Sequence, residues 1–212
     1  MPSLRFSVEG ASVVPHAASP LVALTVRIEN APPDETIHAT LLSCQVRIDA
    51  PLRSYAPSER DRLRDLFGEA DQWSRSLRGL LWTHAAVTVP PFQGSTRVDL
   101  HLPCSADLSS GAAKYFYALE SGHIPLTLQF SGTVFYQADE GLQIARIPWD
   151  REAVFRLDVA VWKQMMAAYY PNTAFLSLRA DVFDRLHRYR AAHGLPTWDH
   201  AVERLLGPER PS

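Results

Sequence analysis

Histidine side chains near the C-terminus are the first groups in this sequence that could bind a metal. His187, His193 and His200 follow one another at spacings of six and seven residues. Histidines that hold one metal ion from a single helix usually lie four residues apart, and Gly194 interrupts this segment. The spacing therefore favours solvated histidines over a metal site.

Cysteine chemistry is limited to two thiols, Cys44 and Cys104. They do not form a CxxC pair, so they make a poor metal site. A chain of this size in a reducing compartment rarely depends on a disulfide. We expect both cysteines to be reduced.

Serine and carboxylate groups offer little more. Ser131 precedes Gly132, but the sequence identifies no base for it, and a glycine within a strand more often marks a bulge. Asp150 and Glu152 follow Pro148-Trp149 and fit an exposed turn. No dinucleotide, P-loop, zinc-protease, nucleophile-elbow or EF-hand motif occurs. The sequence predicts no catalytic residue, no cofactor and no metal, and we expect a protein that is not an enzyme.

The elements that would carry these groups are mostly strands. Apolar and polar residues alternate in many short segments that end at proline or glycine, which is typical of half-buried strands. The predicted strands span 4–8, 21–29, 36–49, 82–89, 95–102, 126–136, 142–147 and 155–161. Because a regular βαβ alternation is missing, the pattern predicts an α+β, mainly β protein with an antiparallel β-sandwich.

Helices are predicted in an insertion and in a C-terminal extension. Ser58 and Asp61 resemble a capping box, which starts a helix that ends at Gly68, and a second helix is predicted over 109–119. The predicted division is a β-sandwich domain over 1–162, with the helical insertion near 57–81, and a helical extension over 163–207. Residues 208–212 are expected to be a disordered tail.

The extension contains the local signals that are most complete. A helix near Trp162 ends before Pro171, and a short alternating run leads to two helices around Gly194, the second capped by Thr197. We expect Ala201, Val202, Leu205 and Leu206 to point inward. The predicted partner-binding residues are Tyr169, Tyr170, Pro171, Asn172, Phe175 and Trp198.

Charge and hydropathy exclude several classes of function. The chain has 212 residues and a net charge of -2, so no strongly basic face for nucleic acid is indicated. Neither a secretory signal nor an apolar run long enough for a membrane span is visible. We expect a cytoplasmic protein without a membrane span.

The order of run, helix, glycine turn and helix in the extension resembles the ribbon-helix-helix fold of small dimeric repressors. That resemblance implies that Phe175, Ser177 and Arg179 face DNA. It also implies that Leu176 and Leu178 point into a dimer core, so a homo-oligomer is an open alternative. The β-domain upstream and the acidic residues that match the arginines depart from the pattern, and DNA binding remains the weaker alternative.

A second resemblance extends over nearly the whole chain. Its motifs are Gln45–Asp49, Leu80–Trp82, Val98–Leu100, Pro103-Cys104, Ala113–Phe116, Phe130–Tyr136, Pro148–Asp150, Tyr170–Asn172 and Leu195–Trp198. With these motifs the sequence resembles a bacterial domain-of-unknown-function family (6084), whose members tend to be encoded near [NiFe]-hydrogenase genes. The resemblance implies an accessory role in that system and no catalytic residues.

Two hypotheses of function follow. The leading one is a non-enzymatic accessory or assembly factor that binds a protein, with a [NiFe]-hydrogenase subunit or maturation factor as the implied partner. The alternative is an enzyme or small-ligand-binding β-sandwich that uses a concave face near Cys104, His101 and His84.

Overall fold

Two antiparallel sheets are the main feature of the fold in this computed structural model, which describes residues 2–107, 110–139 and 141–207. Within these residues the strands are β1 (Ser3–Val13), β2 (Leu21–Ala31), β3 (Ile37–Ile48), β4 (Leu80–Val89), β5 (Ser95–Pro103), β6 (His123–Ala138), β7 (Gly141–Arg146) and β8 (Glu152–Asp158). The smaller sheet has the order β1-β2-β5, and the larger has the order β4-β3-β6-β7, with β8 also paired to β6. The predicted α+β, mainly β sandwich is confirmed.

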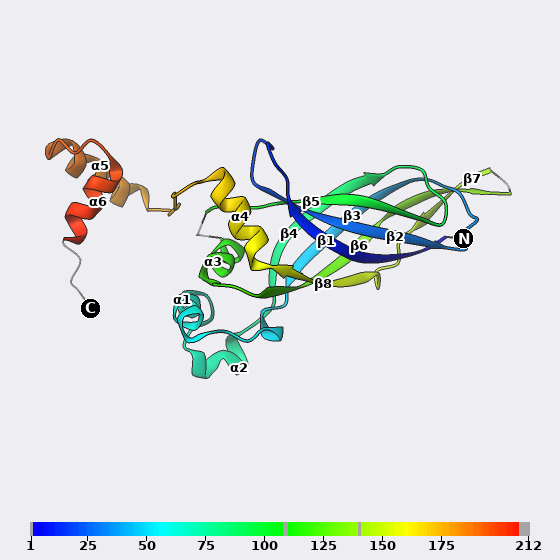
Figure 1. Ribbon diagram of the computed structural model, residues 1–212, viewed down its shortest axis with the longest axis horizontal. Helices are drawn as coiled ribbons and strands as arrows, with labels where there is room; N and C mark the ends of the chain where they lie inside the picture. Colours follow the sequence, from blue (N-terminus) through cyan, green and yellow to red (C-terminus); the bar gives the residue numbers. More distant parts are fainter. Residues whose placement is uncertain (1, 108–109, 140, 208–212) are drawn as a thin grey trace. The chain divides into compact units, whose positions relative to one another are not determined.

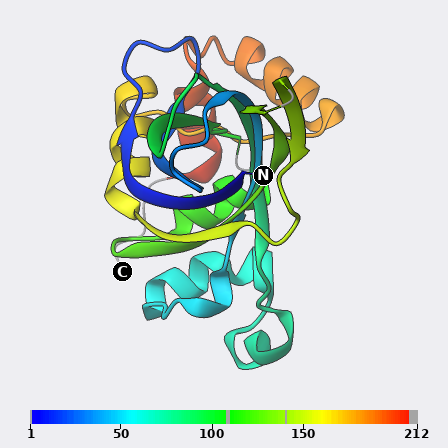
Figure 2. The ribbon, with the colours of Figure 1, turned by 90° about the vertical axis from the view of Figure 1, so that its right-hand side faces the viewer.

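The helices within the described residues lie between β3 and β4, between β5 and β6, and after β8. They are α1 (Pro57–Phe67), α2 (Trp73–Ser76), α3 (Gly111–Ala118), α4 (Val159–Tyr169), α5 (Ala180–Ala192) and α6 (Trp198–Leu206), with 3-10 turns at Ala50–Leu52 and Ala70–Gln72. Figure 1 shows α1, α3 and α4 near one end of the strands and the β6–β7 hairpin at the other end. In Figure 2, α1 (cyan) and α2 (teal) lie below the sheets.

The core lies between the two sheets because each central strand turns alternate apolar residues inward. Val22, Leu24, Val26 and Ile28 of β2 are fully buried. From the larger sheet, Leu42, Cys44, Val46 and Ile48 of β3 are buried as well. The rings of Phe6 and Phe130 stack with centroids 4.3 Å apart, which joins the two sheets directly.

Gly132 lies where β6 changes its outer partner. β8 pairs with β6 up to Gln129, and β7 pairs with it from Thr133 onward. The predicted bulge is wrong, since Gly132 keeps its regular register opposite Leu42. Its φ of +145° and the approach of the Leu41 carbonyl oxygen, which a Cβ would meet at 2.0 Å, explain the glycine instead.

Two local predictions need correction, and others fall on residues that the structure does not describe. The N-cap of α1 is Ala56, whose N–H donates to the Glu59 carboxylate (3.0 Å), so Ser58 lies inside the helix. The last strand ends at Asp158, because this side chain accepts a hydrogen bond from the Ala160 N–H (2.8 Å) and starts α4. Ser109 and Glu140, which were expected in a helix and a hairpin turn, lie outside the described residues, as does the predicted tail 208–212.

The chain divides into a first unit over Met1–Phe175 and a second over Leu176–Ser212. The sequence predicts this boundary at 162/163. The difference arises because α4 packs on β1, β2 and β8 and buries Trp162 and Met165 in the core of the first unit. The second unit contains α5 and α6.

Candidate functional site in the C-terminal unit

Tyr169, the first of the predicted partner-binding residues, anchors α4 within the first unit. Its hydroxyl donates to the carbonyl of Val14 (3.0 Å) and accepts from the N–H of Ala17 (2.9 Å). These two bonds hold the end of α4 against the loop between β1 and β2. The side chain therefore has a structural role in this fold.

The corner after α4 is the last segment of the first unit. Asn172 adopts φ +51°, a left-handed conformation that asparagine tolerates better than most residues, directly after Pro171. The rings of Tyr170 and Phe175 then meet edge to face, with centroids 4.7 Å apart. Phe175 forms an isolated parallel bridge to Asp107, so the corner is tied to the first unit at both ends.

Trp198 holds the two helices of the second unit together. Its ring lies 5.4 Å from that of Phe183 and 5.9 Å from that of His187, centroid to centroid. The guanidinium of Arg190 lies 4.0 Å from the indole centroid, which is a cation–π contact. Thr197 caps α6 as predicted by accepting a hydrogen bond from the His200 N–H. Trp198 is thus half-buried in contact with both helices of the second unit, while the other five predicted residues lie in the first unit.

An apolar groove of about 600 Å³ lies on the second unit. It is lined by Leu176, Leu178, Val182, Arg185, Leu186, Tyr189, Val202, Leu205 and Leu206. Ala201 is the sole buried residue among the described residues of the unit, while Leu205 is 57% and Leu206 is 79% exposed. The expected inward orientation is correct for Ala201 and wrong for Val202, Leu205 and Leu206, because two short helices make one contact layer and leave the rest of the apolar stripe uncovered.

Charge at this groove comes from one arginine. Arg185 lines it and has no ion pair within the described part of the chain. Arg179, by contrast, donates two hydrogen bonds to Asp181, at 2.9 Å and 3.1 Å. An apolar floor beside a free guanidinium suits an apolar segment that carries a carboxylate at its edge.

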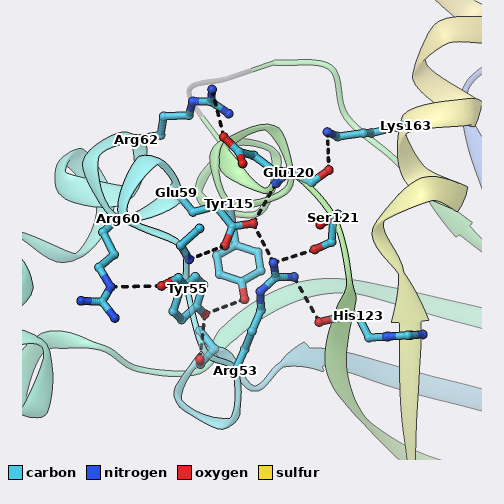
Figure 3. A network of polar contacts seen from close by, with 12 residues as sticks. Arg53, Tyr55, Glu59, Arg60, Arg62, Tyr115, Glu120, Ser121, His123 and Lys163 are labelled. Carbon is cyan, nitrogen blue, oxygen red and sulfur yellow. Dashed lines mark hydrogen bonds and ion pairs between the residues drawn. The ribbon is translucent and has the colours of Figure 1, made fainter.

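A network of polar side chains in the first unit surrounds a buried ion pair (Figure 3). Arg53 donates to Glu59 at 2.7 Å, and both side chains are almost completely buried. The Glu59 carboxylate also accepts from the backbone N–H groups of Glu120 (2.8 Å) and Ala56 (3.0 Å). Nearby, the Tyr55 hydroxyl bonds to that of Tyr115 at 2.7 Å.

The electrostatics of this network keep Glu59 ionised. Burial acts to raise the pKa of the carboxyl, but the N–H groups of Glu120 and Ala56 and the Arg53 guanidinium outweigh it, so the pKa is lowered. Because every donor and acceptor that meets Glu59 belongs to the fold, we assign the network a structural role. The sequence analysis missed it, although a glutamate three residues after the helix N-cap could have indicated the capping bond.

Residues of the predicted ligand-binding face do not come together. Cys104 lines a pocket of about 490 Å³ with Trp82, Phe116 and Trp162, while His84 lines a separate hollow on the larger sheet. His101 lines neither of these two cavities.

Neither thiol is activated as a nucleophile. Cys104 and Cys44 are free and buried, and burial raises the pKa of each thiol to about 12. Over the described ranges, no cluster of three or more His, Cys, Asp or Glu residues could hold a metal ion. No helix in those ranges is both long and apolar enough to cross a membrane.

The fold and the groove define a mainly β, two-sheet protein with a C-terminal helical hairpin that exposes an apolar surface. The chain belongs to the family of unknown function DUF6084, whose model matches residues 1–212. No curated protein matches it. Among solved structures, a similarity of 14% identity and TM-score 0.25 to β-glucosidase 3B from Thermotoga neapolitana covers 73% of this chain and 17% of that one, and it carries no argument about fold or function.

Proposed function

We propose that this chain is a non-enzymatic accessory factor that binds another protein through its C-terminal unit. The observation that carries the proposal is the burial of Ala201 alone among the described residues of that unit. Short isolated helices are marginal in water and gain most of their stability from packing. A hairpin that exposes its apolar stripe is therefore completed by a partner that covers it.

The groove favours a protein segment as its occupant. Leucines dominate its floor, and its volume of about 600 Å³ suits a few large side chains along one face of a helix. Arg185 at the wall pairs with a carboxylate on that segment, which fixes the direction in which it binds. The proposed occupant is an amphipathic helix with an acidic residue at the edge of its apolar face.

The sequence resemblance supplies the candidate partner, a [NiFe]-hydrogenase subunit or maturation factor. The test is affinity purification of the tagged full chain from its native host, followed by binding of the purified partner. We expect a hydrogenase-linked protein to be recovered and to bind directly. Leu186→Asp and Leu205→Asp should each weaken this binding by about tenfold or more, since each places a charge in the apolar floor.

Leu142→Asp is the matched control, because Leu142 is an exposed leucine on β7 of the first unit. It should bind like the unchanged chain. The proposal is overturned if both groove variants bind the partner with unchanged affinity, or if no hydrogenase-linked protein is recovered. Light scattering measures the oligomeric state of the chain. A dimer that both groove variants dissociate would overturn the proposal by assigning the groove to a second copy of this chain.

A further inference from the structure

A hollow of about 720 Å³ lies on the outer face of the larger sheet, away from the core and within the first unit. The strand register builds its floor as a grid. Gln45 of β3 lies opposite both His84 of β4 and Gln129 of β6, and in the next row Ser43 lies between Ala86 and Ser131. The side chains of Ser43, Ala86 and Ser131 are short and those in the row of Gln45 are long, so the surface is lower along the Ser43 row, which forms the hollow.

Trp149 forms the wall of this hollow and is 91% exposed. The loop that carries it is held at both ends on β6. The Ile147 N–H donates to the Gly132 carbonyl (3.0 Å), and the Phe130 N–H donates to the Arg151 carbonyl (2.8 Å). The backbone that carries Trp149 is thus held at the edge of the hollow, while the apolar surface of the indole, on the order of 150–250 Å², stays in water.

The lining combines polar with apolar side chains and lacks the residue types that carry a full charge at neutral pH. Among the described residues that line the hollow, none is Asp, Glu, Lys or Arg. Ser43, Ser131, Gln45, Gln129 and His84 supply hydroxyl, amide and imidazole groups, each able both to donate and to accept. Within the described part of the chain, none of these five side chains bonds to another protein group.

A ligand that matches this surface has an apolar face, a rim of hydroxyl groups and no net charge. A phosphate or carboxylate ligand needs a cation or a set of aimed N–H donors, which this lining does not offer. A sugar ring has the required form, since one face presents C–H groups and the edge presents hydroxyls.

We propose that the hollow binds a chain of neutral sugars, with one ring stacked on Trp149 and its hydroxyls bonded to Gln45, Gln129 and His84. The volume lies inside the range of roughly 300–1,000 Å³ that is usual for small-molecule sites. The site does not involve the C-terminal groove. A variant that loses sugar binding should therefore still bind the protein partner, and the reverse should also hold.

The test uses the full chain and four probes: cellohexaose, maltohexaose, xylohexaose and mannohexaose. Each probe is titrated into the protein while tryptophan fluorescence and the heat of binding are measured. The migration of the protein is also compared between native gels with and without the matching polysaccharide. We expect saturable binding of at least one probe. Trp149→Ala should weaken it by about tenfold or more, and Gln45→Ala combined with Gln129→Ala should do the same.

Two variants serve as controls. Trp149→Phe keeps an aromatic face and should retain binding within a few-fold. Val154→Ala changes an exposed apolar side chain of β8 outside the lining and should bind normally. The melting temperature of Trp149→Ala should equal that of the unchanged chain, since this side chain packs on little.

The inference fails if none of the four probes binds at millimolar concentration, or if Trp149→Ala binds as tightly as the unchanged chain. A protein partner that loses affinity in Trp149→Ala while no sugar binds would also overturn it. Variants of the C-terminal groove should bind the sugar normally, which keeps this outcome separate from the proposed function.

Discussion

Glu59 joins three segments of the first unit through one buried carboxylate. Its oxygens bond to Arg53 after β3, to the N-cap of α1 and to the chain after α3 at Glu120. The most distant partner, Glu120, lies 61 residues from Glu59 in the sequence. An acid with all these donors stabilises the fold only while it is charged, because each donor would otherwise be left unpaired or weakly paired.

Glu59→Gln should lower the free energy of unfolding by about 3 kcal/mol at neutral pH, since Arg53 then loses its counter-charge in a buried site. The folded-state pKa of Glu59 is lowered from 4.5, so its contribution is complete above that pH and is lost as the pH falls through the lower folded value. The difference between the two proteins should therefore shrink in acid. Urea unfolding at pH 7 and pH 3 measures it.

Glu69→Gln is the control for that measurement. Glu69 pairs with Arg64 at the surface, where both side chains are exposed, and such pairs contribute roughly 0–1 kcal/mol. An equal effect of the two substitutions, or a Glu59→Gln effect that is independent of pH, would contradict the assigned role of the network.

Elements that depend on local patterns could be predicted from the sequence, and those that depend on distant contacts could not. The alternation in β3 and the Thr197 cap of α6 are local signals, and both predictions are confirmed. The apolar run after Asp158 fits a strand as well as a helix, so the start of α4 was missed. The Trp149 hollow depends on the register of β3, β4 and β6, which alternation within single strands does not specify.

Gly132 lies between the part of β6 that pairs with β8 and the part that pairs with β7, and the stability of the larger sheet should depend strongly on it. Gly132→Ala places a methyl group against the Leu41 carbonyl and forces an unfavourable φ, so we expect a loss of about 3 kcal/mol or more. Gly10→Ala is the matched control, because a Cβ there meets nothing within 4 Å. Chemical unfolding of both variants provides the comparison, and near-equal stabilities would show that the close approach at Gly132 is not limiting.

At the scale of the whole chain, the two units differ in how their apolar residues are satisfied. The first buries its sheets, α3 and α4 in one continuous core. The second exposes most of its apolar side chains and gains little from its own packing. Because of this difference, the structural boundary lies at 175/176. The stability of the chain therefore depends on the first unit, and the proposed partner binding depends on the second.

Truncation tests that separation. A chain that ends at Phe175 keeps the Tyr169 bonds and the Met165 packing, so its melting temperature should stay within about 2 °C of that of the full chain. A chain that ends at Trp162 loses both and should unfold at least about 3 kcal/mol more easily, because the core position of Met165 is emptied. Both should lose the protein partner, while the first should still bind the sugar chain at Trp149. Partner binding by the chain that ends at Phe175 would place the docking surface in the first unit and refute its assignment to the C-terminal groove.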